Sequence, residues 1–323
     1  MIRAAIAGGT GYTGGELLRI LLNHPMVRVT DVLSSSADGI PVADIHRDLI
    51  GETDLKFGTE MHDPDVLFLC LGHSLSREFI HSHNIGKDCR IIDLGNDFRL
   101  EEDYAERHFV YGLTEAARED IRQAVSIANP GCFATAIQLA LLPLASAGLL
   151  KDEVHVSAVT GSTGAGKKPV ESVHFSYRDN NLSIYKLFSH QHLGEIRKHL
   201  GRISGNEPTI NFVPFRGGFT RGIFASVYTR AVSGVSEKAF TRLFEDYYAD
   251  SPFVFHSTGA VSLKEVVNTN KGLLHVELHD GYVHISSIID NLLKGASGQA
   301  VQNMNLMFSF PEDCGLKFKP SAF

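Results

Sequence analysis

The stretch RAAIAGGTGYTGGELLRILL, residues 3–22, decides the fold class of this 323-residue chain. Its apolar start predicts a strand, the glycine-rich run after it predicts a turn, and the spaced leucines predict an amphipathic helix. In such a unit, glycines let the backbone approach a pyrophosphate, which the helix N-terminus binds. The spacing is GxxGxxG rather than the commoner GxGxxG. A dinucleotide site is expected here, with these contacts: Gly8, Thr10, Gly11, Tyr12, Thr13 and Gly14.

The second predicted strand, VRVTDVLSSS at residues 27–36, indicates which dinucleotide is bound. An NAD site usually has a carboxylate at the end of this strand to hold the ribose 2′-hydroxyl. This chain instead has Ser34, Ser35 and Ser36, whose hydroxyls can donate hydrogen bonds to a 2′-phosphate. NADP is therefore favoured. Arg47 is a possible cationic partner, although a solvated loop arginine is an equally good interpretation.

The order of the remaining apolar segments predicts two domains. The apolar segments at 66–72, 90–95 and 125–129 are predicted strands. Helical or loop segments separate them, as in a parallel doubly wound sheet. Longer alternating strands follow, the last two joined by Asp280-Gly281 as a hairpin. Their residues are 154–162, 209–215, 221–230, 260–267 and 273–290.

The expected fold is α/β, with a Rossmann-type doubly wound parallel sheet and a second α+β domain whose sheet is mainly antiparallel. The first domain should comprise residues 1–131 together with a returning helix from about residue 295 to 323. Residues 132–294 should form the catalytic, substrate-binding and oligomerisation domain.

Composition excludes several classes of protein. A net charge of −7 without a basic run argues against a nucleic-acid partner. No apolar stretch is long enough to span a membrane, and the apolar N-terminal segment is too short for a signal peptide. The four cysteines show no CxxC pair, which predicts reduced thiols. A cytoplasmic protein is expected.

Cys132 lies in the run NPGCFATA and begins an apolar stretch that predicts a buried helix. A thiol at a helix N-terminus faces unpaired backbone N–H groups and the positive end of the macrodipole, which stabilise a thiolate. The strand before it would place the sulfur at the carboxyl edge of a sheet, where open α/β folds bind ligands. Cys132 is the predicted nucleophile; a small core cysteine is the alternative.

The loop GSTGAGKK, residues 161–168, nearly matches the phosphate-binding pattern GxxxxGK. Lys168 and Pro169 follow where a magnesium-binding hydroxyl should stand, which argues against a nucleoside triphosphatase. The loop could hold a smaller phosphate, or it could be a surface turn.

The run HQHLGE, residues 190–195, combines two histidines with a glutamate. An acid/base histidine oriented by a carboxylate is the favoured interpretation. Zinc would need a further ligand, and no second cluster has metal-ligand spacing, so no metal is expected. His192 is favoured over His190 because it stands one helical turn from Glu195. The choice between the two histidines stays open.

These motifs, with IIDLGNDFRL (91–100), RGIFASVY (221–228) and NLLKGASGQAVQNMNLM (291–307), occur in the order found in the N-acetyl-gamma-glutamyl-phosphate reductases, which this chain resembles along its length. The resemblance implies a Rossmann domain, a second domain of the glyceraldehyde-phosphate-dehydrogenase type and NADPH as hydride donor. It also implies Cys132 as nucleophile and a histidine of the pair as acid/base. The implied activity is reductive dephosphorylation of an acyl phosphate to a semialdehyde, through a cysteine thioester, in arginine synthesis.

The resemblance also implies further site residues and a homodimer or homotetramer. Arg99 and Arg221 are the predicted anion anchors, because a guanidinium can bind a carboxylate or phosphate through two hydrogen bonds. Either arginine could instead be a structural ion-pair residue. The additional cofactor contacts are Gly164 and Asn291, and the substrate or phosphate contacts are Arg99, Asn129, Ser162, Lys167 and Arg221.

Some positions depart from the family pattern. Gln191 stands where the family often has Arg, Gly194 stands where it often has Pro, and the runs at 96–99 and 178–186 also differ. These differences leave the N-acyl group of the substrate open between acetyl and succinyl. Aminoadipyl or aspartyl phosphates are related alternatives, and a non-catalytic NADP-binding sensor is the alternative of another class.

Overall fold

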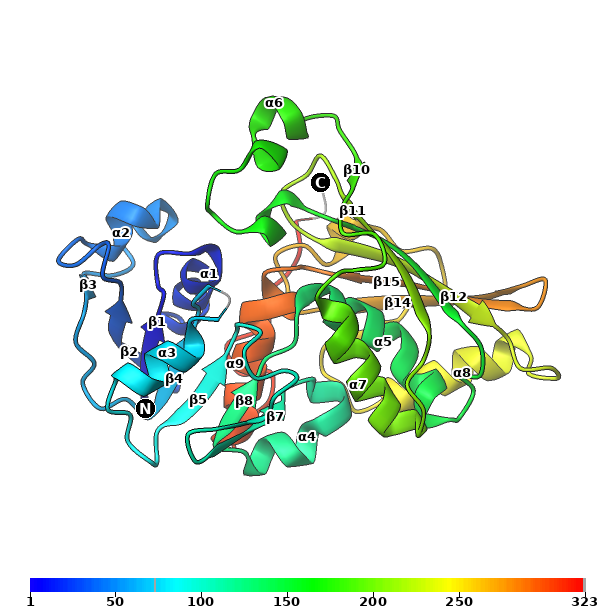
Figure 1. Cartoon of the computed structure of the whole chain (residues 1–323), viewed down its shortest axis with the longest axis horizontal. Helices are drawn as coiled ribbons and strands as arrows, with labels where there is room; N and C mark the ends of the chain where they lie inside the picture. The colour runs from blue at the N-terminus through cyan, green and yellow to red at the C-terminus, as the bar shows by residue number, and fades with distance from the viewer. Residues whose placement is uncertain (73, 322–323) are drawn as a thin grey trace. The chain divides into compact units, whose positions relative to one another are not determined.

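The computed structural model describes residues 1–72 and 74–321, which form two compact units (Figure 1). The first comprises Met1–Gly131 and Ala296–Lys317. The second comprises Cys132–Gly295 and the described residues from Phe318 onward. The chain thus leaves the first unit immediately before Cys132 and returns to it after Gly295.

The first unit is built on an eight-stranded sheet with the order β3-β2-β1-β4-β5-β8-β7-β6. Every neighbouring pair is parallel except β6 and β7, which confirms the predicted doubly wound sheet. The short strands β6 and β7 lie in a charged segment without apolar alternation and were not expected. The strands are β1 (Ile2–Ala7), β2 (Val27–Leu33), β3 (Phe57–Gly58), β4 (Val66–Leu69), β5 (Arg90–Asp93), β6 (Asp103–Tyr104), β7 (Arg107–Tyr111) and β8 (Ser126–Ala128).

A helix from the end of the chain completes this unit. Every residue of α9 (Gly298–Met307) is buried, and the helix packs against α1 and α4. The Asn303 amide accepts from Thr114 Oγ1 at 2.9 Å and donates to Gly112 O at 2.9 Å, which fixes the depth of the helix. The other helices are α1 (Tyr12–Leu21), α2 (Val42–Ile45), η1 (Arg47–Leu49), α3 (Ser76–Ser82) and α4 (Thr114–Gln123).

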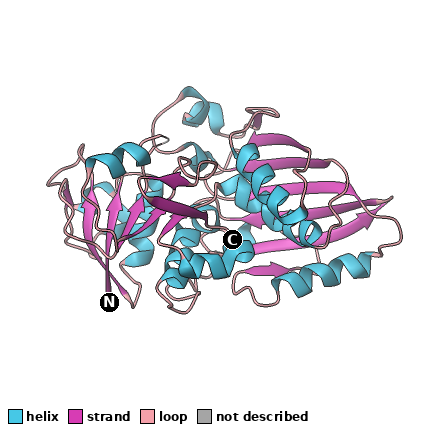
Figure 2. Cartoon of the chain, turned by 60° about the horizontal axis from the view of Figure 1, so that its bottom comes forward, coloured by secondary structure: helices cyan, strands magenta, loops and turns pink. Residues whose placement is uncertain are grey.

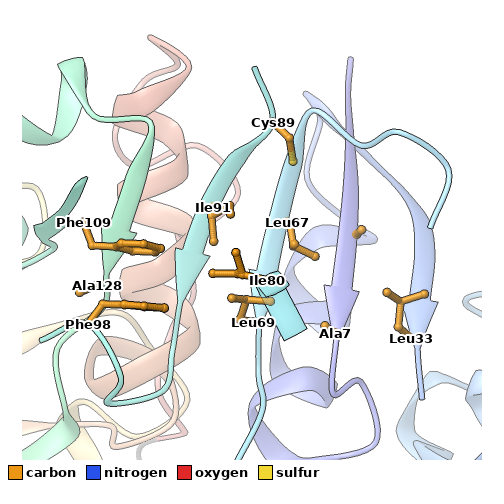
Figure 3. Packing of buried hydrophobic residues seen from close by; sticks show 11 residues of the cluster. Ala7, Leu33, Leu67, Leu69, Ile80, Cys89, Ile91, Phe98, Phe109 and Ala128 are labelled. Atoms are coloured by element: carbon orange, nitrogen blue, oxygen red, sulfur yellow. The ribbon is translucent and has the colours of Figure 1, made fainter. Parts of the chain in front are cut away.

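Apolar side chains from β1, β2, β4 and β5 pack with α3 and with the Phe98–Phe109 pair into one cluster (Figure 3). The two phenylalanine rings are stacked with centroids 3.8 Å apart, and both side chains are fully buried. Burial of a phenylalanine side chain contributes about 1.5–3 kcal/mol. This cluster includes Ala5 and Ala7 of β1, the strand whose carboxyl end leads into the glycine-rich turn.

The second unit is built on a seven-stranded sheet with the order β10-β11-β9-β12-β15-β14-β13. Most pairs are antiparallel, as expected, whereas β9 with β11 and β13 with β14 are parallel. Asp280 (φ 46°) and Gly281 (φ 80°) form the predicted tight turn between β14 and β15. The strands are β9 (Val154–Thr160), β10 (Ser183–Ile184), β11 (Ile210–Arg216), β12 (Ile223–Arg230), β13 (Val254–His256), β14 (Gly272–His279) and β15 (Tyr282–Ile289).

Helices α5, α7 and α8 cover one face of this sheet (Figure 2). Helix α5 is apolar on all sides and almost wholly buried, as the sequence predicts. Within residues 1–72 and 74–321, no helix is both long enough and apolar enough to cross a membrane. The elements are α5 (Cys132–Ser146), η2 (Ser162–Ala165), η3 (Glu171–Val173), α6 (Phe175–Arg178), α7 (His192–Ser204), α8 (Glu237–Tyr248), η4 (Leu263–Glu265) and η5 (Leu293–Ser297).

One predicted strand is wrong. The run at 260–267 forms the 3-10 turn η4 instead of a strand. Ser262 and Glu265 make a capping box, in which the Glu265 carboxylate accepts the backbone N–H of Ser262 at 2.7 Å. These side chains accept the backbone N–H groups that a strand would hydrogen-bond to a neighbouring strand. The Ser-x-x-Glu spacing of the capping box is present in the sequence.

Candidate active site

Cys132 is the first residue of α5, the position that the sequence predicts for a nucleophile. Its side chain is half-buried. The backbone of Gly295 lies so close that a Cβ there would come within 2.8 Å of Cys132 Cβ, so only glycine fits. By contrast, Cys89 is buried among apolar groups, and burial raises the pKa of its thiol to about 11. That thiol stays protonated at neutral pH.

Both histidines of the HQHLGE run pack beside the start of α5. The ring of His190 lies edge-on to the ring of Phe133, with centroids 5.3 Å apart, and the ring of His192 lies 6.4 Å from the same phenylalanine. Phe133 is the residue that follows Cys132. The two histidines are therefore brought to the N-terminal end of the helix that carries the thiol.

His192 begins α7, and its Nε2 lies 3.9 Å from Glu195 Oε1 one helical turn later. Both side chains are buried. At this distance the contact is electrostatic rather than a hydrogen bond. The helical relation between His192 and Glu195 expected from the sequence is present, so the carboxylate faces the imidazole.

His190 has a different environment. Its Nδ1 accepts the backbone N–H of His192 at 3.2 Å, so this nitrogen satisfies a donor at the start of α7. Burial, followed by the positive charges of Lys186 and Arg216, lowers the pKa of His190 to about 4. His190 is therefore neutral near pH 7, with one ring nitrogen engaged as an acceptor.

The low pKa of His190 predicts a pH dependence of stability. Between about pH 6.5 and about pH 4 the unfolded chain binds a proton at this residue and the native chain does not, so stability falls as pH falls through that range. His190→Asn keeps an acceptor but removes the titration. Urea unfolding from pH 7 to pH 4 should show a loss smaller in the variant by up to about 3 kcal/mol. Equal losses in both proteins would contradict the assignment.

Tyr185 and Arg216 belong to this cluster and carry no sequence motif. The Tyr185 ring lies 5.7 Å from the His190 ring, and the Arg216 guanidinium lies 4.5 Å over the Tyr185 ring. Burial and then the negative charge of Cys132 raise the pKa of the Tyr185 phenol, against the opposing effect of Arg216. The sequence carries one signal for Arg216. Side chains alternate between the two faces of β11, so Arg216 lies on the same inward face as Phe212.

The GSTGAGKK loop begins with the 3-10 turn η2, and Ser162 and Gly164 lie in that turn. Ser162 is half-buried, whereas Gly164 and Lys167 are exposed. The Asn291 amide donates to Thr163 Oγ1 at 3.0 Å and accepts from the N–H of Gly222 at 2.7 Å. Asn291 thus holds the loop in place. The sequence predicts this residue as a cofactor contact, and in this structure its amide bonds to the protein.

The two arginines expected as anion anchors are engaged within the protein. Arg221 pairs with the buried carboxylate of Asp290 through Nε at 3.1 Å and Nη2 at 3.2 Å. Arg99, in the first unit, donates to Asn129 O at 2.9 Å and to Leu94 O at 3.2 Å. In this structure Arg221 forms an ion pair with Asp290, which is the alternative to an anion anchor that the sequence leaves open.

Asn129 is buried in the first unit and is held by the returning segment of the chain. Its Nδ2 donates to Ala296 O at 3.1 Å, and its Oδ1 accepts from Asn303 at 3.1 Å. These contacts position the turn that leads into Cys132.

The glycine-rich turn is packed too closely for side chains at Gly8 and Gly14. Gly8 has φ +79°, and a Cβ there would lie 2.5 Å from Cys70 O. A Cβ at Gly14 would lie 2.7 Å from Gly9 O, so α1 packs directly on the turn. Gly11 precedes the first helical residue, Tyr12, without a side-chain cap, which leaves the helix N-terminus available to an anion.

Other parts of the chain support this turn. The carbonyl of Thr13 accepts from Ser297 Oγ at 3.0 Å. His46 Nε2 lies 2.7 Å from Gly9 O, a contact that no motif indicates. Thr10, in the turn itself, is half-buried.

The serines at the end of β2 lie where the sequence expects a contact to the 2′-position of the ribose. Ser35 and Ser36 are exposed, and Ser34 Oγ lies 3.2 Å from Ser36 Oγ. Arg47 is exposed in the short turn η1. Hydroxyls rather than carboxylates therefore end this strand.

Family models match both units. Residues 3–124 match the NAD binding domain of semialdehyde dehydrogenase, and residues 132–291 match its dimerisation domain. N-acetyl-gamma-glutamyl-phosphate reductases from Phocaeicola vulgatus and Azobacteroides pseudotrichonymphae are 50% and 52% identical to this chain over 326 residues. In both comparisons the match covers 100% of each chain.

Solved structures with low sequence identity share the fold. Aspartate semialdehyde dehydrogenase II from Vibrio cholerae superposes with a TM-score of 0.73 at 17% identity, covering 96% of this chain and 98% of its own. The Candida albicans enzyme, solved with NADP, gives 0.74 at 15% identity and covers 95% and 98%. The family resemblance inferred from the motifs is confirmed: this chain belongs to the semialdehyde dehydrogenase family and, within it, to the N-acetyl-gamma-glutamyl-phosphate reductases.

Proposed function

We propose that this oxidoreductase reduces N-acetyl-gamma-glutamyl phosphate to the semialdehyde and phosphate in arginine synthesis, using NADPH and a cysteine thioester. The observation that carries the proposal is the placement of Cys132 at the start of a buried helix beside the two histidines, in a chain about half identical to reductases of this name. A phosphorylating semialdehyde dehydrogenase needs these two kinds of group.

The Cys132 thiolate attacks the γ-acyl carbon of the substrate. A carbon–sulfur bond forms, the carbon–oxygen bond to phosphate breaks, and phosphate leaves with the bonding electron pair. The start of α5 supports this step, because its backbone N–H groups and macrodipole favour the charged form of the sulfur. We propose that Ser162 and Lys167 of the loop and Arg99 contribute to binding of the phosphate or carboxylate groups.

His192 is the proposed acid/base. Its Nε2 faces the Glu195 carboxylate, which favours the imidazolium during proton transfer. In this role His192 gives a proton to the substrate oxygen after reduction and removes it as the carbon–sulfur bond breaks and the aldehyde leaves. His190, engaged as an acceptor, positions the first turn of the same helix.

The first unit is a NAD-binding domain, and its residues fit a phosphorylated dinucleotide. The backbone at Gly8 and Gly14 leaves no space for side chains, and hydroxyls stand at the end of β2. NADPH, when bound there, would supply the hydride that reduces the thioester.

The serines give a test of cofactor choice. Ser35→Asp places a carboxylate where the 2′-phosphate of NADPH is expected, so the KM for NADPH should rise by about tenfold or more through charge repulsion, and NADH should become the better donor. Initial rates with each dinucleotide measure the change. A wild-type enzyme that already prefers NADH would contradict the assignment.

The activity itself is best assayed in reverse, because acyl phosphates hydrolyse in water. The chain, NADP, phosphate and N-acetylglutamate semialdehyde should yield NADPH, whereas aspartate and N-acetylaminoadipate semialdehydes should react poorly. Formation of NADPH with none of the aldehydes would favour the NADP-binding sensor instead.

The dimerisation-domain match indicates self-association, and a homodimer or homotetramer is the proposed state. The proposed location is the cytosol. None of the four cysteines, all in the described part of the chain, forms a disulfide, as a reducing compartment requires.

A further inference from the structure

His190 uses only one of its two ring nitrogens within the protein. Its Nδ1 accepts the backbone N–H of His192 at 3.2 Å, so Nδ1 carries no proton. A neutral imidazole without a proton on Nδ1 has its proton on Nε2. The ring of His190 is therefore the Nε2–H tautomer, and Nε2 is a hydrogen-bond donor.

This donor has no acceptor in the protein. Within residues 1–72 and 74–321, no side chain or backbone group forms a hydrogen bond with His190 Nε2. The residue is 5% exposed, and Nε2 does not belong to the buried polar atoms that lack a partner, so this nitrogen retains some accessible surface. A largely buried imidazole thus presents one unused N–H group at an accessible point.

Aromatic rings hold the imidazole of His190 in place. The rings of Phe133, Tyr185 and Phe212 lie 5.3, 5.7 and 5.5 Å from it, and each meets it edge-on. These three side chains are uncharged at neutral pH. A hydrogen bond to an anion is stronger in such surroundings than in water, so the donor is both fixed in position and effective.

The environment also keeps His190 neutral. Burial and then the positive charges of Lys186 and Arg216 lower the pKa of His190 to about 4. Lys186 is held close by a hydrogen bond to Gln191, which stands between the two histidines. Protonation of Nδ1 would in addition break its contact with the His192 N–H. A neutral imidazole does not release its Nε2 proton near pH 7, so His190 can donate a hydrogen bond without transferring the proton.

This donor lies in the neighbourhood of the nucleophile. Phe133, whose ring meets the His190 ring, directly follows Cys132 in the chain. The ring of His192, the proposed acid/base, lies 4.6 Å from the His190 ring. Attack of a thiolate on an acyl carbon moves the carbonyl electron pair onto the substrate oxygen, and the same oxygen becomes negative again when the thioester is reduced. Fixed N–H donors stabilise such an oxygen.

We propose that His190 is a catalytic residue that donates its Nε2–H to the substrate oxygen while that oxygen is negative. The inference rests on the proposed function and leaves proton transfer to His192. During acylation the carbon–sulfur bond forms, the carbonyl electron pair moves to the oxygen, and it returns as phosphate leaves. After reduction the oxygen holds the charge until His192 protonates it. His190 keeps its own proton throughout.

Two substitutions separate this role from a purely positioning role. Asparagine at residue 190 keeps an acceptor for the His192 N–H, but its amide stops short of the Nε2 position. Glutamine is longer and places an N–H group near the Nε2 position. With NADP, phosphate and N-acetylglutamate semialdehyde, His190→Asn should lower kcat by about 10²–10³-fold, and His190→Gln should be at least about tenfold faster than His190→Asn. A positioning role predicts the opposite order.

The pH profile and the thiol provide matched controls. The loss in His190→Asn should be the same from pH 6 to pH 9, because His190 does not titrate in that range. Alkylation of Cys132 by iodoacetamide in the absence of substrate should keep its wild-type rate in both variants, because no substrate oxygen takes part. His108→Asn, at an exposed position of β7 whose side chain is 59% accessible, should keep the wild-type kcat.

The outcomes separate this inference from the proposed function. Production of NADPH by none of the proteins, the wild type included, would reject the function itself. A kcat of His190→Asn within about threefold of wild type, a glutamine variant slower than the asparagine variant, or slowed alkylation of Cys132 would overturn only the role of His190. If neither variant folds, nitrogen-15 NMR of the wild-type imidazoles is the second readout. A His190 ring that carries its proton on Nδ1 between pH 6 and pH 8 would also overturn the inference.

Discussion

Cys132→Ser is expected to lose nearly all reductive turnover, by about 10³-fold or more, while NADPH binding is retained. A serine hydroxyl is far harder to ionise than a thiol, and the N-terminus of α5 does not close that gap. The substitution leaves the apolar helix that follows unchanged. Loss of NADPH absorbance with the acyl phosphate measures turnover, and fluorescence titration measures cofactor binding.

Cys314→Ser is the matched control, because Cys314 is also half-buried and burial raises the pKa of its thiol. It should keep wild-type turnover. Alkylation with iodoacetamide should inactivate the wild type and the Cys314 variant at equal rates. Substantial turnover by Cys132→Ser would rule out the covalent mechanism.

His192→Asn is expected to lower kcat by about 10²–10⁴-fold with a smaller effect on substrate KM. Asparagine is of similar size but has no titratable nitrogen to face Glu195. The group lost is the imidazole nearest to a buried carboxylate at the first turn of α7. Steady-state kinetics from pH 6 to pH 9 should also show that one limb of the wild-type profile disappears.

His199→Asn serves as the control on the same helix. His199 Nδ1 contacts Gln138 Oε1 at 2.5 Å, far along α7 from the histidine pair, so its loss should affect stability rather than kcat. If His190→Asn instead shows the large loss while His192→Asn remains active, the two roles must be exchanged. If both remain active, the histidine run is structural.

Local sequence patterns predicted most of the fold. The strand, turn and helix at residues 2–21 and the Asp280-Gly281 hairpin depend on nearby residues, and both are present. The run at 260–267 was misassigned because its apolar residues suggest a strand, whereas the Ser262–Glu265 capping box favours a turn. The five-residue π-helical turn at 293–297 has no sequence signal of comparable strength.

The candidate site also combines relations that local spacing predicts with relations that depend on long-range pairing. The relation between His192 and Glu195 is one helical turn and follows from spacing alone. The register that pairs Ser183 of β10 with Arg216 of β11 is a long-range choice that spacing does not specify. The sequence leaves Arg221 open between an anion anchor and a structural ion-pair residue, because no local pattern indicates its pairing with Asp290.

The late position of α9 in the chain constrains the order of folding during synthesis. Residues 1–131 leave the ribosome first, but the ten-residue helix that packs against α1 and α4 is made after residues 132–295 of the second unit. Until then, Thr114 and Gly112 lack the amide of Asn303 that pairs with them. Most of the second unit is encoded in the continuous segment 132–295, which can pack its core earlier. A chain arrested before residue 296 would therefore contain most of the second unit and a first unit open to chaperones and proteases.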